Sequence, residues 1–346
     1  SKDNPQAYEP VLAQSYNNLA ALYSDIQRFE ESEAMHKSAL AIRERLAKDN
    51  PQAYEPDLAR SYNNLAALYS DTQRFKESEA MYLTALAIRE RLSKDNPQAY
   101  EPVLAQSYNN LAALYSDTQR FKESEAMYQS ALAIHERLAK DHPQAYEPDL
   151  AVSYNNLAIL YKHTQRFAES EAMCKSALAI RERLAKDNPQ AYEPDLADSY
   201  YNLANLYSDT QRFKESETLY KSALAIRERL ARDNPQAYEP DLANSYNNLA
   251  ILYKHTQRFA ESEEMHKSAL AIYERLARDN SQAYEPNLAN SYNNLANLYR
   301  ATQQFAESEA MHKSALAIRE RLAKDNPQAY EPDLAESYNN LANLYS

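Results

Sequence analysis

Apolar residues recur along this chain with the spacing of an α-helix, and the whole pattern returns every 46 residues. In the first copy, one apolar stripe falls at i, i+4, i+7, i+8 and i+11, which is the spacing of a helix and not of a strand. It consists of Leu12, Tyr16, Leu19, Ala20 and Tyr23. A second apolar stripe consists of Phe29, Met35, Ala39, Leu40 and Leu46. Each copy is therefore predicted to form a pair of amphipathic helices.

The prolines lie between successive pairs and predict where the helices end and begin. Asn-Pro-Gln-Ala-Tyr-Glu-Pro recurs here, with His142 in place of Asn in one copy and Ser281 in place of the first Pro in another. Proline stops a preceding helix and suits the first turn of the next. One helix is thus predicted to end near Asn50 and the next to begin near Pro56, with a linker between them. Asn50 is expected to adopt the left-handed conformation that usually requires glycine.

The repetition also sets the domain organisation. Because so narrow an apolar stripe cannot be buried within one helix pair, the pairs must stack on their neighbours. The predicted fold is all-α, an α-solenoid of helix-turn-helix repeats forming one domain over 1–346. The repeats are 1–46, 47–92, 93–138, 139–184, 185–230, 231–276 and 277–322, followed by a half repeat, 323–346. Since the chain begins with Ser1 and stops after a first helix, it is expected to be part of a longer protein.

The second helix of each copy carries a charged side, which is expected to face solvent. This side consists of Glu31, Glu33, Lys37, Arg43 and Glu44. Such groups recur in most copies. This recurrence is typical of a solvent-exposed helix face and not of a single active site.

Composition excludes several classes of function. The 346 residues contain no glycine, where average usage would give about 24, so glycine-rich phosphate loops and dinucleotide-binding turns are excluded. The net charge of −12 repels a nucleic-acid backbone. No apolar run approaches the ~18–20 residues that a membrane span needs. Neither nucleic acid nor membrane is an expected partner, and a cytoplasmic location is expected.

No catalytic, cofactor or metal site is expected. His163 and His255 lie two repeats apart, too far to share a zinc ion, whose bonds are about 2 Å long. Each is interpreted as closing a helix C-terminus beside a lysine. Cys174, the single cysteine, occupies a position that other copies fill with Tyr or His, and is interpreted as a packing residue without a base to activate it. The chain is predicted not to be an enzyme.

One set of residues resembles the tetratricopeptide repeat. It consists of Tyr16-Asn-Asn-Leu19-Ala20-Ala-Leu-Tyr23, then Phe29, Ser32, His36, Ala39 and Leu40. The Asn-Asn-Leu-Ala run and the Arg-Glu-Arg-Leu-Ala-Lys-Asp-Asn-Pro ending resemble the kinesin-light-chain-like branch, which also occurs in bacterial signalling proteins. Gln27 lies where the family often has Gly, and the 46-residue period is attributed to a longer linker than in 34-residue units. The resemblance implies a right-handed superhelix with a concave, peptide-binding groove.

The residues that differ between copies share one face of the first helix. They occupy repeat positions 14, 17, 21, 24 and 25, apart from the apolar stripe, and by the resemblance they line the groove. The first three copies lean acidic, through Asp25, Asp71 and Asp117. The candidate contact residues of the later copies are Val152, Ile159, Lys162, His163, Asp198, Tyr201, Asn205, Asp209, Ile251, Lys254, His255, Asn297 and Arg300.

Four of these candidates are apolar or aromatic. Val152, Ile159, Tyr201 and Ile251 are hypothesised to form an anchoring patch, since buried groups of this kind carry most binding energy. The alternative is that they are separate surface residues.

An asparagine occupies repeat position 18 in every copy: Asn18, Asn64, Asn110, Asn156, Asn202, Asn248, Asn294 and Asn340. An amide can both donate to and accept from the main chain of an extended peptide, and the column resembles the asparagine ladder of several tetratricopeptide families. The alternative is a hydrogen bond between neighbouring repeats. The ladder is favoured because position 17 is also Asn in seven of eight copies, and both cannot easily be buried.

These expectations together indicate an interaction module. The chain is predicted to bind an extended peptide or partner segment in the groove, as the sensor or scaffold part of a larger signalling protein. The alternative is a structural spacer, or a scaffold that associates with itself end to end.

Overall fold

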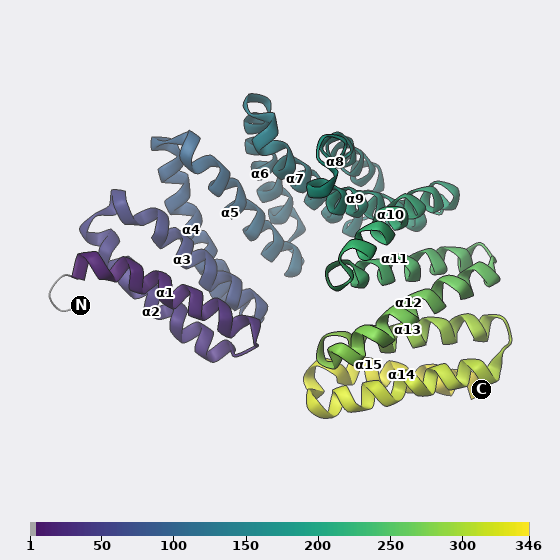
Figure 1. Cartoon of the computed structure of the whole chain (residues 1–346). Coiled ribbons are helices and arrows are strands. Elements are labelled where there is room, and N and C mark those ends of the chain that lie inside the picture. Colours follow the sequence, from purple (N-terminus) through teal and green to yellow (C-terminus); the bar gives the residue numbers. More distant parts are fainter. Residues whose placement is uncertain (1–4, 346) are drawn as a thin grey trace. The chain divides into compact units, whose positions relative to one another are not determined.

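The computed structural model describes residues 5–345, with side chains from Tyr8 onward, as a succession of α-helices (Figure 1). The helices are α1 (Pro5–Asp25), α2 (Phe29–Asp49), α3 (Pro51–Asp71), α4 (Phe75–Asp95), α5 (Pro97–Asp117), α6 (Phe121–Asp141), α7 (Pro143–His163), α8 (Phe167–Asp187), α9 (Pro189–Asp209), α10 (Phe213–Asp233), α11 (Pro235–His255), α12 (Phe259–Asp279), α13 (Ser281–Ala301), α14 (Phe305–Asp325) and α15 (Pro327–Tyr345). Consecutive helices from α1 to α7 and from α9 to α15 pack against one another, as the sequence predicted.

Each complete repeat consists of two 21-residue helices with almost no linker. A three-residue turn separates α3 from α4, and the single residue Asn50 separates α2 from α3. The predicted linker before Pro56 is therefore wrong, and the extra length over a 34-residue unit lies in the helices.

The helix begins at Pro51 because proline is tolerated where the N–H has no helical partner. The Asn50 side chain caps the new helix by accepting from the Ala53 N–H at 3.3 Å. Pro56 lies inside the helix and removes only the bond to the carbonyl of the exposed Gln52.

Left-handed backbone occurs in the turn within each repeat and not at Asn50, which has φ −143°. The left-handed residues have φ of 59–61° and are Gln27, Gln73, Gln119, Gln165, Gln211, Gln257 and Gln303. In the second repeat the Gln73 N–H donates to the Ser70 carbonyl at 2.9 Å, and the Arg74 N–H donates to the Tyr69 carbonyl at 2.7 Å. This pair of bonds is a Schellman motif, in which glutamine fills the position that glycine usually takes.

Contacts group the chain into two compact units, Ser1–Ile180 and Arg181–Ser346. Within each unit, an odd-numbered helix buries its apolar side against the preceding repeat. In the first unit, Leu65, Leu68 and Tyr69 of α3 pack against Phe29 and Leu40 of α2. The second unit has the same arrangement, and its corresponding cluster comprises Leu249, Leu252 and Tyr253 with Phe213, Tyr220 and Leu224. This nearest-neighbour stacking is that of an α-solenoid, as predicted.

A buried arginine links three helices and corrects the expectation that Arg43 faces solvent. Arg43 is only 2% exposed. Its Nη1 donates to the Asp57 carbonyl at 3.1 Å and to Ser61 Oγ at 2.7 Å, both on α3, and its Nη2 donates to Gln14 Oε1 on α1 at 3.0 Å. The guanidinium is buried because these polar groups, which lie on other helices, satisfy its donors. Arg89, Arg181, Arg227 and Arg319 are buried at the same repeat position.

Two repeats use other residues at this position, of which His135 keeps the bond between repeats and Tyr273 bonds within its own repeat. His135 Nδ1 lies 2.7 Å from Ser153 Oγ. The Tyr273 hydroxyl donates to Asn244 Oδ1, within its own repeat, and to the Pro240 carbonyl. The position therefore requires a polar group that reaches a neighbouring helix, and charge is not essential to it.

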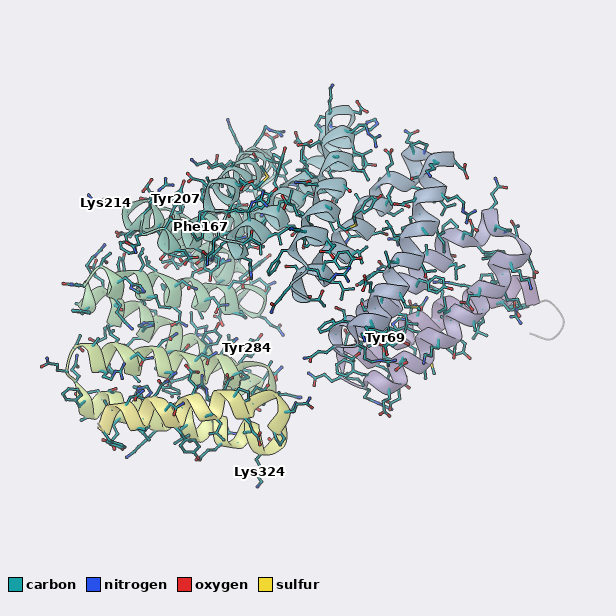
Figure 2. The ribbon with its side chains drawn as sticks, turned by 180° about the vertical axis from the view of Figure 1, so that it is seen from behind. Tyr69, Phe167, Tyr207, Lys214, Tyr284 and Lys324 are labelled. Atoms are coloured by element: carbon teal, nitrogen blue, oxygen red, sulfur yellow. The ribbon has the colours of Figure 1, made fainter. Side chains whose placement is uncertain are left out.

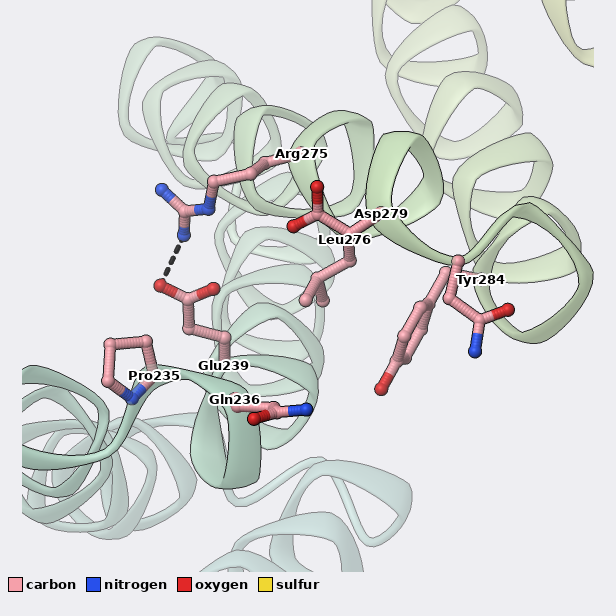
Figure 3. A pocket seen from close by; sticks show the side chains of 8 residues that line it. Pro235, Gln236, Glu239, Arg275, Leu276, Asp279 and Tyr284 are labelled. Carbon is pink, nitrogen blue, oxygen red and sulfur yellow. Dashed lines mark ion pairs between the residues drawn. The ribbon is translucent and has the colours of Figure 1, made fainter.

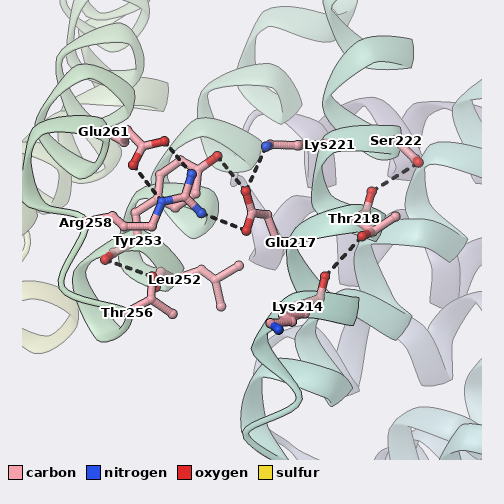
Figure 4. Close-up of polar contacts among 10 residues, drawn as sticks. All are labelled: Lys214, Glu217, Thr218, Lys221, Ser222, Leu252, Tyr253, Thr256, Arg258 and Glu261. Carbon is pink, nitrogen blue, oxygen red and sulfur yellow. Dashed lines mark hydrogen bonds and ion pairs between the residues drawn. The ribbon is translucent and has the colours of Figure 1, made fainter.

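A second polar network joins the repeats near the turns (Figure 4). Glu217 of α10 accepts from Arg258 Nη1 at 2.7 Å, from the Tyr253 hydroxyl at 3.3 Å and from Lys221 Nζ at 2.7 Å. The Arg258 guanidinium lies 4.1 Å from the centroid of the Tyr253 ring and also pairs with Glu261. In the first unit, Tyr69, which Figure 2 labels, makes the equivalent bond to Glu33. Part of the charge predicted to be solvated thus connects neighbouring repeats.

A buried histidine and asparagine form a further connection between repeats. His266 of α12 is 1% exposed, and its Nδ1 lies 3.0 Å from Asn247 Oδ1 of α11. Asn247 Nδ2 in turn donates to Ser291 Oγ of α13 at 3.1 Å. Burial, with a smaller contribution from Lys254, lowers the pKa of His266 to about 4. His266 is therefore neutral at physiological pH.

Replacing Gln119 by Gly is expected to raise the free energy of unfolding by about 1 kcal/mol, because glycine adopts positive φ without the penalty of a Cβ. The matched control is Gln129→Gly, which places glycine inside α6 and should lower stability by about 1 kcal/mol. Urea unfolding followed by circular dichroism measures both. A loss of stability in Gln119→Gly would contradict the strain assigned to the turn.

Replacing Arg89 by Met is expected to lower the free energy of unfolding by about 2–3 kcal/mol, because it leaves the Val103 carbonyl and Ser107 Oγ without their charged donor. The control is Arg91→Met, which removes an exposed ion pair with Glu55 and should cost less than about 1 kcal/mol. Equal losses of stability in the two variants would show that the buried hydrogen bonds of Arg89 contribute no more than the exposed ion pair of Arg91.

Stability is expected to fall as the pH drops from 6.5 towards 4. Over this range the unfolded chain binds a proton at His266 that the folded chain, with its lowered pKa, does not bind. The expected contribution of His266 between pH 7 and pH 5 is about 2 kcal/mol. His266→Gln should remove that part of the pH dependence, whereas the exposed control His255→Gln should not. Urea unfolding at pH 7 and pH 5 gives the free energy of unfolding of the wild type and of the two variants. The same change of this free energy with pH in all three proteins would contradict the role of His266.

Candidate functional site

The odd-numbered helices of adjacent repeats are joined directly by side chains. Asn110 Nδ2 of α5 donates to Asn63 Oδ1 of α3 at 2.9 Å in the first unit. Asn248 Nδ2 of α11 donates to the Tyr201 hydroxyl of α9 at 2.5 Å in the second. These helices therefore form a continuous surface in each unit, here named the odd-helix surface. In every repeat it comprises positions 14, 18, 21, 24 and 25, which are exposed or half-buried in the described chain.

Position 17 is half-buried at Asn63 and Tyr201 but enclosed in other repeats, where Asn17, Asn109, Asn247 and Asn293 are buried. Asn17 is 5% exposed and connects its own repeat to the next. Its Oδ1 lies 3.0 Å from His36 Nδ1, and its Nδ2 donates to Ser61 Oγ at 3.3 Å. The side chain points between helices because position 17 lies beside the buried Ala13 and Ala20.

The predicted ladder at position 18 lies on the odd-helix surface, but several of its amides are already bonded within the chain. Asn18 Oδ1 accepts from Gln14 Nε2 at 2.8 Å. Asn110 and Asn248 bond to the preceding repeat, as does Asn340, which donates to Asn293 Oδ1 at 3.3 Å. This is the bond between repeats that formed the alternative interpretation.

Other members of the ladder are available. Asn64, Asn156 and Asn294 are half-buried on the surface and make no side-chain hydrogen bond within the described residues. Their amides are free to bond a ligand, and the ladder remains a prediction for these repeats.

The four residues of the hypothesised apolar patch have different environments. Val152 and Ile159 are 41% and 43% exposed in the first unit, whereas Ile251 is half-buried in the second. The Tyr201 ring already packs edge-on against Tyr220, with centroids 5.8 Å apart, and the Arg227 guanidinium lies 4.8 Å from its centroid. Tyr201 is therefore mostly engaged within the protein.

The predicted polar and charged candidates lie near the helix ends or in internal pairs. Lys162 and His163 end α7, and Lys254 and His255 end α11, as the sequence predicted. The His255 ring is parallel to that of Phe213, with centroids 6.4 Å apart. Three further candidates, Asn297, Arg300 and Asp209, are exposed or half-buried on the surface.

Two candidates are held by buried side chains of their own repeat. Asp198 accepts from Arg227 Nη2 at 2.6 Å. Asn205 Oδ1 accepts from the Tyr220 hydroxyl at 2.5 Å. Both side chains are thereby fixed in orientation on the surface.

Position 36 of the repeat, a packing position as the sequence predicted for Cys174, is buried beneath this surface on the even-numbered helices. It contains His36, Tyr82, Tyr128, Cys174, Tyr220, His266 and His312. The bond from Tyr220 to Asn205 places the tip of this side chain beneath position 21. Burial, together with Asp71 and Asp117, raises the pKa of Tyr82 to about 12, which places its hydroxyl close to position 25. The available signal was the change among His, Tyr and Cys at an otherwise interior position.

The residues that the structure describes form no arrangement that points to a reaction. Burial raises the pKa of the Cys174 thiol to about 11, so it is not a ready nucleophile. An open cavity of ≈ 700 Å³ lies where α11, α12 and α13 meet, and its charged residues Arg275 and Glu239 pair with each other (Figure 3). Among the described residues there is no group of three or more His, Cys, Asp or Glu side chains placed to hold a metal ion. In the same part of the chain, no helix has the length and apolar character to cross a membrane.

Comparison with known proteins identifies the repeat. Models described as tetratricopeptide repeat match residues 12–52, 58–98, 104–144, 149–229, 195–275 and 241–321. No curated protein sequence matches the chain.

Solved structures are similar in fold. BtubC (BKLC) from P. vanneervenii is 25% identical, with a TM-score of 0.59 over 73% of this chain and 92% of that one. A putative kinesin light chain of Podosopora anserina with nearly identical repeats is 19% identical, with a TM-score of 0.50 over 65% and 98%. The signal transduction ATPase PH0952 from Pyrococcus horikoshii, which has a tetratricopeptide repeat sensor, is 14% identical, with a TM-score of 0.61 over 96% and 44%. The matched repeats cover most of the chain, which belongs to the tetratricopeptide repeat family.

Proposed function

We propose that the odd-helix surface binds an extended segment of a protein partner. Tetratricopeptide repeats are protein-interaction modules, and this chain offers no competing catalytic constellation among its described residues. The observation that carries the proposal is the set of half-buried, unbonded amides of Asn64, Asn156 and Asn294, which recur at one repeat position while the surrounding positions vary.

The spacing of these amides suits an extended main chain. Side-chain bonds between odd-numbered helices place neighbouring helix axes about 10 Å apart. An extended peptide rises about 3.3 Å per residue, so one repeat corresponds to about three ligand residues. Each amide can both donate to and accept from the ligand backbone, while positions 14, 21, 24 and 25 contact side chains and select among ligands.

The module fits the sensor or scaffold part of a larger cytoplasmic signalling protein. Support comes from the fold of PH0952, in which a tetratricopeptide repeat array of similar structure is the sensor of a signal transduction ATPase. In this role, ligand binding to the array is the input, and the effector lies outside it.

A self-associating scaffold is the second candidate, and one observation favours it. Leu19 and Leu22 of α1 are 36% and 54% exposed, whereas the equivalent Leu65 and Leu68 of α3 are 2% and 4% exposed. An apolar helix side of this kind favours stacking between molecules. Light scattering against concentration separates the two candidates, because a peptide-binding monomer keeps a constant mass.

Replacing Asn64, Asn156 and Asn294 together by Ala is expected to weaken binding at least tenfold for peptides of unrelated sequence, because main-chain bonds do not depend on the ligand's side chains. The peptides are those enriched from a random 12-residue display library on the wild-type chain, and fluorescence anisotropy measures their Kd. The control replaces the exposed amides Gln52, Gln98 and Gln129 by Ala and should change Kd less than twofold. Unchanged binding by the asparagine variant would contradict main-chain capture.

A further inference from the structure

The asparagine at repeat position 17 has two different sets of partners in this chain. Asn17 of the first repeat is turned inward: its Oδ1 lies 3.0 Å from His36 Nδ1, and its Nδ2 donates to Ser61 Oγ of the next repeat at 3.3 Å. Because an amide oxygen can only accept, His36 Nδ1 carries the proton in this bond. The sixth repeat has the same inward state, formed by Asn247, His266 and Ser291.

In two other repeats the same asparagine is turned outward, towards the ladder. Asn63 Oδ1 of the second repeat accepts from Asn110 Nδ2, the ladder amide of the third repeat, at 2.9 Å. Asn293 Oδ1 of the seventh repeat accepts from Asn340 Nδ2, the ladder amide of the half repeat, at 3.3 Å. This bond takes up a donor that a ligand backbone would use. The outward state therefore competes with a ligand for the ladder amide.

The state of the asparagine matches the availability of the ladder amide that follows it. Asn64 and Asn294 follow the two inward asparagines, and neither makes a side-chain hydrogen bond within the described residues. Asn110 and Asn340 follow the two outward asparagines, and both are bonded. In the third repeat, which has a tyrosine at position 36, Asn109 is in neither state, and its Oδ1 is buried without a hydrogen bond.

The residue at position 36 accounts for the inward state. Both inward asparagines bond a histidine there, whose Nδ1 lies close to the helix that carries it. A tyrosine has its hydroxyl at the far end of the ring, and Tyr220 uses it to bond Asn205 at position 21. No hydrogen bond joins Tyr82 of the second repeat to Asn63 in the described chain. Histidine thus gives the asparagine an interior partner that tyrosine does not.

The seventh repeat shows that both states are open to the same residue types. It has His312 at position 36, as the first and sixth repeats have histidine, yet its asparagine is outward. His312 is 1% exposed, and neither of its ring nitrogens has a hydrogen-bond partner. A buried donor without a partner is unfavourable, and the bond from Asn340 to Asn293 offsets part of that loss. The histidine therefore favours the inward state without making it obligatory.

We propose that His36 and His266 are positioning residues that keep the ladder open. Each holds its position-17 asparagine inward, and the following ladder amide, Asn64 or Asn294, is thereby left to bond the backbone of a ligand. The proposal rests on the proposed function. A histidine and an asparagine that only filled the interior would have no relation to the ladder of the next repeat. The residues at position 36 thus help to set where along the array a ligand backbone is held.

Replacing His36 and His266 together by Tyr tests this coupling, because tyrosine already occupies the position in the second, third and fifth repeats. Asn17 and Asn247 then lose their interior partner, which favours the outward state. The matched control is His312→Tyr, the same substitution in a repeat whose asparagine is already outward. The ligands are 12-residue peptides enriched from a random display library on the wild-type chain. Fluorescence anisotropy measures Kd, and circular dichroism compares helix content.

The variant with both His36→Tyr and His266→Tyr is expected to raise Kd about fivefold or more, because two ladder amides are withdrawn from the ligand. His312→Tyr should change Kd less than about twofold. Adding Asn17→Ala and Asn247→Ala to the double tyrosine variant should return Kd to within about twofold of the wild type, because the ladder amides lose the groups that captured them. A histidine that only supported packing would give no such rescue.

The reverse substitution, Tyr82→His, tests the same coupling in a protein that keeps both histidines. It gives Asn63 an interior partner and should release Asn110, so Kd is expected to fall about twofold or more. A crystal structure of this variant should show Asn63 Oδ1 within hydrogen-bonding distance of the new imidazole. An Asn63 that still accepts from Asn110 would contradict the proposal.

The outcomes separate this proposal from the proposed function. Peptides that depend on Asn64, Asn156 and Asn294, yet keep their affinity in the double tyrosine variant, would overturn the role of the histidines and leave the proposed function standing. A loss of affinity that the two alanine substitutions do not reverse would do the same. Failure to enrich any peptide would overturn both.

Discussion

The apolar side of an odd-numbered helix is buried by packing against the preceding repeat, and much of the structure follows from that requirement. Leu65 and Leu68 are buried because α2 of the preceding repeat covers them. The polar groups that these interfaces enclose must then be satisfied across the same boundary, as Arg43 and Asn17 are. Hydrophobic contact thus brings the repeats together, and the buried donors and acceptors fix how one repeat is placed on the next.

The helix pairs, their stacking and their family could be predicted from the sequence because a 3.6-residue apolar period depends on local geometry alone. The helix boundaries were less accessible. Pro56 resembles a helix start, yet the helix begins at Pro51, since Asn50 caps it and one missing bond near its start costs little. The left-handed residue was assigned to Asn50, although the Schellman bonds require it at Gln27, in the sharper of the two connections.

The location of the candidate site on the first helix of each repeat could be predicted from the sequence. The hydrogen bonds that its side chains make within the protein could not. A helical wheel shows that positions 17 and 18 are adjacent, but only the neighbouring repeat decides that Asn17 is enclosed and Asn64 is left open. Arg43 was misassigned for the same reason, since its partners Asp57 and Ser61 belong to the following repeat. Position 36 was recognised as a packing position, but its bond to a surface residue, as from Tyr220 to Asn205, depends on the neighbouring helix and could not be predicted.

The connections between repeats have a consequence for how such an array changes in length. Arg74 bonds Glu33, Arg120 bonds Glu79 and Arg166 bonds Glu125, and in each case the partners are 41 residues apart. Since these junctions use the same partners, a gene that gains or loses one of these repeats by unequal recombination still encodes matched junctions. The ligand-facing residues would then be presented in a new order on an unchanged scaffold, which makes duplication and deletion a direct route to new specificity.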